Sequence, residues 1–249
     1  MQNYTEDYLL DKKIKIFQPV GGYRASTDAV LLSSFVSAAK TGQHILDVGS
    51  GTGAISLCLA ERFKNSGITV TGLELQPELA QLSGLSTQSN GFDFVRFLNV
   101  DIRRKISGIT PGGFQHVITN PPYAGHDMAS PNRGKALAHN REDISLSEWI
   151  NFCIKMTAPK GCFYTINRAE AVAEILAALH GKMGSIRLVP LYSKAGREAK
   201  RVIVSARKDS KAPAIISPGF VVHEEDGSYT PAAQRILRDG LSFDEAVSG

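Results

Sequence analysis

The 249-residue sequence has few cysteines, no long apolar run and no residue spacing typical of a metal site. Its three cysteines, Cys58, Cys153 and Cys162, are far apart and stand among apolar residues. This usage favours buried, reduced thiols and a cytoplasmic protein over a disulfide framework. No C-x-x-C or H-x-x-x-H spacing occurs and the six histidines are scattered, so we predict no metal site.

We predict neither a membrane-spanning segment nor a secretory signal from the sequence. No uninterrupted apolar stretch approaches the roughly 18–20 residues that a membrane-spanning helix needs. The first seven residues have neither a basic start nor an apolar core, so no secretory signal is visible. With 43% hydrophobic and 21% charged residues, the composition is that of a globular protein. The formal net charge of +4 mildly favours an acidic partner.

A glycine-rich turn follows the short apolar stretch 45–48 and precedes a segment with helical rhythm, 54–60. A strand, a glycine turn and a helix open a nucleotide-binding α/β unit, and the glycines let the backbone approach a ligand closely. Gly49, Gly51 and Gly53 give the spacing G-x-G-x-G, which argues against a standard dinucleotide pyrophosphate site. Asp47 precedes the first glycine, where a carboxylate suits an amino group better than a phosphate.

Two further acidic residues follow predicted strands. Glu74 ends the predicted strand 70–74, about twenty residues beyond the glycine turn, where a carboxylate commonly accepts hydrogen bonds from a ribose diol. Asp101 follows the predicted strand 94–98 and is placed to meet an adenine amino group. In open α/β sheets, ligands bind at the carboxyl ends of the strands. We therefore expect these side chains to share one cleft with Asp47.

The most informative stretch is the end of the next predicted strand, 114–119, which runs into Asn120, Pro121, Pro122 and Tyr123. The two prolines fix their own φ and forbid both a helix and further strand pairing. The result is a stiff loop that holds one amide, backbone carbonyls and one aromatic ring. An amide oxygen and a carbonyl can accept two N–H groups while the ring stacks on a flat molecule, so this loop suits a planar substrate that carries an amino group.

The region 155–207 is basic. Residues 155–207 contain ten lysines and arginines against three acids, an excess that suits a phosphate backbone. Two predicted strands, 186–192 and 201–206, flank residues 193–201, which we call the basic connector. We predict RNA contacts at one N-terminal arginine and four connector residues: Arg24, Lys194, Arg197, Lys200 and Arg201.

Other segments carry weaker expectations. A helix is predicted from Ser26 or Thr27 to about Ala39, because a capping residue precedes an apolar stripe. Residues 124–142 form a long charged segment, which inside a compact domain is usually a lid or a mobile loop.

Together these motifs resemble those of the class I S-adenosylmethionine-dependent methyltransferases. Residues 46–53 look like the first cofactor motif, Glu74 like the second and Asp101 like the third. Residues 120–123 look like the catalytic N-P-P-Y motif of members that methylate nitrogens in planar systems. Residues in the 18–28 and 199–201 segments extend the resemblance to the bacterial tRNA(Val) adenine-N6 methyltransferases, over most of residues 9–207.

The resemblance implies an α/β fold, namely a doubly wound, seven-stranded, mostly parallel sheet whose last strand is antiparallel. We expect an N-terminal strand and helix extension over residues 1–40, a catalytic domain over 41–207 and a C-terminal extension over 208–249. The implied cofactor is S-adenosylmethionine, held by Asp47, the three glycines, Glu74, Asp101 and Asn120. The implied reaction is methyl transfer to an exocyclic base nitrogen, with adenine N6 in tRNA as the first expectation.

Other readings share parts of this pattern. A protein glutamine-N5 methyltransferase also uses N-P-P-Y on a planar amide, but such enzymes carry a larger helical domain before the glycine motif than the roughly 45 residues available here. A guanine-N2 methyltransferase acting on rRNA would use the same chemistry. A DNA adenine methyltransferase usually has a sizeable target-reading domain, and none is evident. A binding module without catalysis would not explain an intact N-P-P-Y beside an intact cofactor motif.

Overall fold

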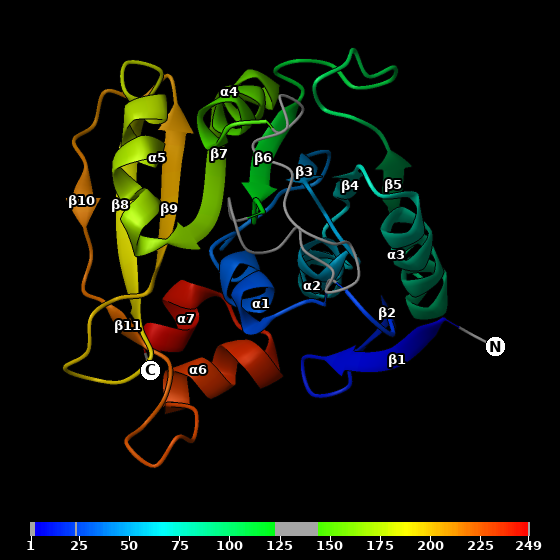
Figure 1. The fold of residues 1–249 in the computed structure, drawn as a ribbon. Coiled ribbons are helices and arrows are strands. Elements are labelled where there is room, and N and C mark those ends of the chain that lie inside the picture. The colour runs from blue at the N-terminus through cyan, green and yellow to red at the C-terminus, as the bar shows by residue number, and fades with distance from the viewer. Residues whose placement is uncertain (1–2, 23, 123–143, 249) are drawn as a thin grey trace, which may run out of the picture.

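The computed structural model describes residues 3–22, 24–122 and 144–248 (Figure 1). Its strands are β1 (Tyr4–Leu9), β2 (Ile14–Pro19), β3 (His44–Val48), β4 (Thr69–Glu74), β5 (Val95–Asn99), β6 (Phe114–Thr119), β7 (Thr157–Arg168), β8 (Met183–Tyr192), β9 (Arg201–Lys208), β10 (Ile215–Ile216) and β11 (Phe220–Val221). Its helices are α1 (Thr27–Ser33), α2 (Ala54–Phe63), α3 (Pro77–Asn90), α4 (Leu146–Met156), α5 (Val172–Leu179), α6 (Pro231–Gln234) and α7 (Phe243–Val247), with a 3-10 turn at Ala169–Ala171 and a π-helical turn at Arg235–Asp239.

The central sheet has the predicted doubly wound α/β architecture. Its order is β10-β8-β9-β7-β6-β3-β4-β5, with β11 also paired to β8. All pairings in it are parallel except those of β9, which runs antiparallel to both β7 and β8. Within the described residues the sheet has nine strands rather than the predicted seven. The seven expected strands are all present, and the two-residue strands β10 and β11 are added because the chain after Lys208 returns along β8.

Alternating side chains along β3 show how the sheet is covered on both faces. Ile45 packs into the cluster that contains α1 and α2, whereas Leu46 packs into the cluster that contains α4 and α5. Successive strand residues point to opposite faces, so apolar residues on both sides demand a helical layer on each. In Figure 1 these two layers flank the sheet. The carboxyl edge of the sheet is left to the loops.

Helix α1 is shorter than predicted, because it ends at Ser33 instead of near Ala39. The hydroxyls of Ser33 and Ser34 donate to the carbonyls of Val30 and Leu31, which competes with continued helix formation. The guanidinium of Arg62 on α2 then donates to the carbonyl oxygens of Ser33 and Val36 at 2.5 and 2.8 Å. The apolar stripe after Ser33 therefore packs as a turn that α2 holds in place.

The N-terminal segment forms a hairpin that docks on α3. Strands β1 and β2 pair in antiparallel register. The free side of β2 bonds to α3 side chains: Lys15 N–H donates to Asn90 Oδ1, and Phe17 N–H donates to Ser86 Oγ, both at 2.9 Å. These bonds cover the side of β2 that the hairpin would otherwise present as an open edge. The predicted domain limits at residues 40 and 207 stay a prediction.

Within the described residues, no helix combines the length and the apolarity needed to cross a bilayer.

Candidate active site

The register of three neighbouring strands places the glycine turn, Glu74 and Asn120 at one level. Val48 pairs with Thr119 on β6 and with Leu73 on β4, and each of the three predicted site elements begins one residue later. Neighbouring strands lie about 4.8 Å apart, so the backbones at Asn120 and Glu74 are roughly 10 Å apart, with Gly49 between them. The carboxyl ends of β6, β3 and β4 thus bring the predicted cofactor and catalytic residues to a single edge.

Two glycines of the turn, Gly49 and Gly53, leave no room for a side chain. Gly49, Gly51 and Gly53 have φ angles of +72°, +56° and +87°, a region that costs other residues energy. A Cβ at Gly49 would lie 2.7 Å from the Trp149 ring, and a Cβ at Gly53 would lie 2.7 Å from the Phe97 ring. The sequence therefore needs glycine here both for backbone geometry and for packing.

Asp47 is completely buried beneath this turn. One carboxylate oxygen, Oδ2, accepts a hydrogen bond of 2.7 Å from the Ser56 hydroxyl on α2. Among the described residues the other oxygen, Oδ1, has no donor. Burial raises the pKa of Asp47 to about 7, an effect that the Ser56 hydrogen bond only partly offsets. An amino group donated to Oδ1 would satisfy the one part of this carboxylate that the fold leaves vacant.

Glu74, also buried, joins the two loops that flank it. Its Oε2 accepts Gly51 N–H and its Oε1 accepts Gln76 N–H, both at 2.8 Å. Each carboxylate oxygen has a second lone pair, so both can still accept a hydroxyl proton. The predicted diol contact is therefore compatible with the internal bonds, which fix the carboxylate's orientation.

Asp101 is engaged by a neighbour. Arg103 forms a bidentate pair with it, with Nε 2.9 Å from Oδ1 and Nη2 2.8 Å from Oδ2. This pairing, together with the Arg103 backbone N–H, lowers the pKa of Asp101 to about 2. The contact of Asp101 with a cofactor adenine stays a prediction, and it requires the carboxylate to accept an amino proton beside the guanidinium or to exchange partners.

Asn120 leaves β6 with its amide oxygen buried. Among the described residues Oδ1 has no hydrogen-bond donor. Pro121 is buried and Pro122 is exposed, so the chain turns out toward solvent directly after the asparagine. Tyr123 and the segment 124–142 lie outside the described residues. A buried amide acceptor with no partner is costly, at about 1–3 kcal/mol, unless a ligand supplies the donor.

Trp149 on α4 was missed in the sequence analysis, although it is the single tryptophan. Its Nε1–H donates to Thr119 Oγ1 at 2.9 Å, and Thr119 Oγ1 donates to the Val48 carbonyl at 2.7 Å. The same indole ring packs against Gly49. One side chain therefore ties the residue before Asn120 to the strand that carries the glycine turn. Only its position in an amphipathic helix was visible in the sequence.

Leu75 was also missed. It follows Glu74 directly, yet 58% of it is exposed. An exposed apolar side chain beside buried acids suits the face of an aromatic ring. The signal available in the sequence was its position after a predicted ligand-binding carboxylate.

The predicted RNA contacts divide into three groups. Arg24 pairs with Asp7 at 2.7 Å and Arg201 pairs with Asp28 at 3.0 Å, so both arginines form ion pairs within the chain. Lys194 Nζ donates to the Glu225 carbonyl at 2.6 Å. Within the described part of the chain, Arg197 and Lys200 are exposed and their side chains have no hydrogen-bond or ion-pair partner. All five stay predictions as RNA contacts.

The site fits S-adenosylmethionine by its own chemistry. Four buried side-chain oxygens at this edge have no donor among the described residues: Asp47 Oδ1, Ser50 Oγ, Thr52 Oγ1 and Asn120 Oδ1. Buried polar atoms without hydrogen-bond partners are rare in protein cores, so this group of oxygens indicates a polar ligand. Three glycines in the turn leave room for the backbone to approach a ligand. The Glu74 carboxylate, which bonds to both flanking loops, provides a diol acceptor, and the exposed Leu75 provides an apolar surface. Within the described residues no cluster of acidic, histidine and cysteine side chains could hold a metal ion.

Comparison with known proteins agrees with this chemistry. Residues 25–142 match the family model of the methyltransferase small domain. The fold superposes on the crystal structure of a predicted O-methyltransferase from Agrobacterium tumefaciens with a TM-score of 0.70 and 26% identity, over 86% of this chain and 96% of the other. The chain is an S-adenosylmethionine-dependent methyltransferase.

Relatives of this methyltransferase carry a more specific name. The tRNA1(Val) (adenine(37)-N6)-methyltransferase of Porphyromonas gingivalis strain ATCC 33277 is 26% identical over 234 residues, which cover 90% of this chain and 91% of the relative. The protein of the same name from Shewanella baltica strain OS185 is 28% identical over 226 residues, 88% of this chain and 92% of the relative. M. jannaschii TYW2, crystallised with AdoMet, shares only the fold, with a TM-score of 0.56 and 11% identity over 83% and 86% of the two chains.

Proposed function

We propose that this methyltransferase transfers the methyl group of S-adenosylmethionine to an exocyclic amino nitrogen of an RNA base, with adenine N6 in tRNA as the target. The observation that carries the proposal is the buried Oδ1 of Asn120, which has no donor among the described residues and lies at the same edge as the glycine turn. An amide oxygen accepts protons and cannot donate them, so this position calls for a substrate N–H. The names of the relatives support tRNA as the carrier of that group.

The proposed roles follow from the chemistry of an aromatic amine. When bound, S-adenosylmethionine supplies an electrophilic methyl: the amino lone pair forms the new N–C bond, the C–S electron pair goes to sulfur, and the nitrogen loses one proton to water. Asn120 Oδ1 and the Pro121 carbonyl accept hydrogen bonds from the two amino N–H groups. These bonds draw the nitrogen toward tetrahedral geometry, localise its lone pair and strengthen as positive charge develops.

The remaining residues orient the two reactants. Asp47 Oδ1 would accept the cofactor's amino group, Glu74 its ribose hydroxyls and Asp101 its adenine. Tyr123 would stack on the target base, which for aromatic–base contacts contributes about 1–3 kcal/mol. Because the leaving group is already good, correct placement supplies much of the rate enhancement, and no general base is assigned. A base that is stacked or paired in the RNA must be extruded first.

The test is methyl transfer from labelled S-adenosylmethionine to separate pools of unmodified tRNA, rRNA, DNA and protein, followed by nucleoside analysis. The proposal expects label in tRNA as N6-methyladenosine. Label in rRNA as N2-methylguanosine, in glutamine of protein, or on an oxygen atom would each replace it with a different substrate class. The Asn120→Ala variant is the internal control, because label that it still incorporates does not depend on the proposed amide acceptor.

A further inference from the structure

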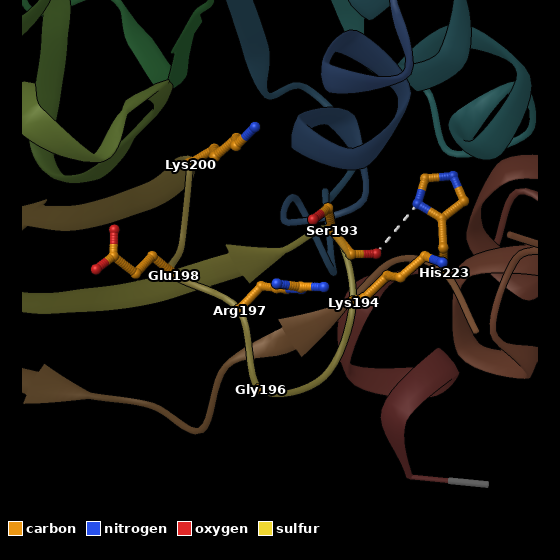
Figure 2. Close-up of a pocket in the computed structure, with 7 residues that line it drawn as sticks. All are labelled: Ser193, Lys194, Gly196, Arg197, Glu198, Lys200 and His223. Carbon is orange, nitrogen blue, oxygen red and sulfur yellow. Dashed lines mark hydrogen bonds between the residues drawn. The ribbon is translucent and has the colours of Figure 1, made fainter. Parts of the chain in front are cut away.

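A second concave surface lies between the basic connector and the C-terminal extension (Figure 2). The hollow has a volume of about 570 Å³. Its lining combines three cations, one acid and one imidazole: Ser193, Lys194, Gly196, Arg197, Glu198, Lys200 and His223. An excess of positive charge around a hollow favours an anionic ligand. The lining contains none of the residues assigned above to the cofactor or to catalysis.

Two of the three cations of this hollow are available for a ligand. Arg197 and Lys200 are exposed and, within the described part of the chain, their side chains bind no other group. By contrast, Arg24 and Arg201 are held by Asp7 and Asp28. Among the five predicted RNA contacts, Arg197 and Lys200 are therefore the two whose side chains are not bonded to another described residue.

The C-terminal extension holds the connector in shape. The backbone N–H and Nδ1–H of His223 both donate to the Ser193 carbonyl, at 3.0 and 3.2 Å. The Lys194 ammonium donates to the Glu225 carbonyl, and the His223 ring stacks on Tyr229 with centroids 5.0 Å apart. Figure 2 shows the His223–Ser193 bond at the wall of the hollow. A loop fixed from outside loses less entropy when its cations bind a ligand.

The position of the hollow points to the RNA strand that carries the target base. Strand β9 begins opposite Arg168, the last residue of β7, and β7 runs parallel to β6 beside it. The connector therefore emerges at the same edge as Asn120, about two strand spacings or roughly 10 Å to the side. This interval is short enough for nucleotides next to the target base to span.

We propose that this hollow is a phosphate-binding subsite for the RNA strand flanking the methylated nucleotide, in which Arg197 and Lys200 bind phosphate oxygens and His223 positions the connector. The inference rests on the proposed RNA substrate. It also gives the C-terminal extension a role, because that segment supplies the groups that shape the connector. Phosphate contacts position an RNA without reading its sequence, so the subsite acts on affinity and register.

The experiment compares two charge-matched double variants of the full chain. Arg197→Ala with Lys200→Ala removes the proposed contacts. Lys40→Ala with Lys211→Ala removes two exposed cations at the opposite edge, before β3 and after β9. Binding of end-labelled unmodified tRNA is measured from 50 to 200 mM salt, together with kcat at saturating tRNA. Melting temperatures verify that both variants fold.

The expected result is a smaller salt slope for the first variant only. Each lost single-strand phosphate contact reduces the slope by about 0.7, so two contacts give about 1.4. The loss of affinity relative to wild type should then be about sevenfold greater at 50 mM than at 200 mM salt. The kcat of the Lys40/Lys211 variant at saturating tRNA should stay at the wild-type value. His223→Ala should weaken binding while leaving the slope near the wild-type value, because both cations remain.

Two contrary outcomes are distinguishable. If wild-type protein methylates tRNA but the Arg197/Lys200 variant binds with an unchanged slope, or the Lys40/Lys211 variant loses as much, the subsite proposal is wrong and the proposed function stands. If wild-type protein transfers methyl to no RNA, the proposed function fails and the subsite fails with it.

Discussion

Two loops at the same edge of the sheet differ in their burial and in the kind of ligand contact that they offer. The glycine turn after β3 is largely buried, leaves no space for a Cβ at Gly49 or Gly53, and is bordered by oxygens that have no donor among the described residues. The basic connector after β8 is largely exposed, and two of its cations, Arg197 and Lys200, have no acceptor among the described residues. The first loop selects a ligand by shape and hydrogen bonding, and the second by charge. Their difference separates the chemistry of methyl transfer from the capture of the RNA.

The largest predicted effect is that of Asn120→Ala, which tests whether Asn120 acts on the substrate. If Asn120 acts on the substrate and not on the cofactor, kcat should fall about 10²–10³-fold, the loss typical of one preorganised transition-state hydrogen bond. The Kd of S-adenosylmethionine, measured by calorimetry, should change little. Asn151→Ala, at an exposed amide on α4, is the matched control and should leave both values near wild type. Equal losses of kcat and cofactor affinity would assign Asn120 to the cofactor alone.

The next largest effect concerns the shape of the glycine turn. Gly49→Ala adds a methyl group 2.7 Å from the Trp149 ring at a φ of +72°. Backbone strain alone costs about 1–2 kcal/mol. We expect a lower melting temperature and at least a tenfold weaker cofactor affinity. Gly84→Ala is the control, because its Cβ meets nothing within 4 Å and it lies inside α3. That change should stabilise the protein by about 1 kcal/mol.

The buried Asp47 carboxyl predicts how stability without cofactor depends on pH. Its pKa is about 7 in the folded protein against 3.8 for the unperturbed group. The folded state therefore binds the proton more tightly, so this group's contribution is full below pH 3.8 and is lost as pH rises through about 7. Denaturant unfolding of the cofactor-free protein should show a loss of a few kcal/mol from this group between pH 4 and pH 7.5. Asp47→Asn should flatten that dependence. A wild-type profile no steeper than that of the variant would show that Asp47 stays ionised when buried.

The smallest predicted effect tests how Trp149 joins the glycine turn to the end of β6, directly before Asn120. Trp149→Phe keeps a ring against Gly49 and removes the Nε1–H that donates to Thr119. Thr119 Oγ1 still donates to the Val48 carbonyl, so the lost bond should cost about 1 kcal/mol of stability. If this bond positions Asn120, kcat should fall several-fold at unchanged cofactor Kd. Equal kcat in the variant and the wild type would make Trp149 a packing residue only.

The sequence was sufficient to predict much of the sheet and to place three predicted site residues at one edge of it. Strands β3, β4, β5 and β6 and helix α2 lie close to their predicted positions, because apolar runs with glycine or proline at their ends specify local structure strongly. Asp47, Glu74 and Asn120 reach one edge as expected, because parallel strands deliver their carboxyl ends together.

Interactions between distant residues were beyond such reasoning. The early end of α1 depends on Arg62, which is 29 residues from the Ser33 carbonyl that it binds. The roles of Trp149 and His223 depend on partners about 30 residues away, and no local pattern specifies them. Arg24 and Arg201 pair with acids that are distant in the sequence. Only the structure therefore distinguishes these two arginines from cations that have no partner.

The short strands β10 and β11 have a consequence for how the protein behaves in a concentrated solution. They occupy the outer side of β8, whose backbone groups would otherwise be open to a strand of another molecule. Ile215 and Ile216 remain exposed there, at 59% and 75%, so this edge of the sheet is apolar but short. A chain shortened after Lys208 would present ten consecutive residues of β8 as an unpaired margin, and self-association would compete with refolding.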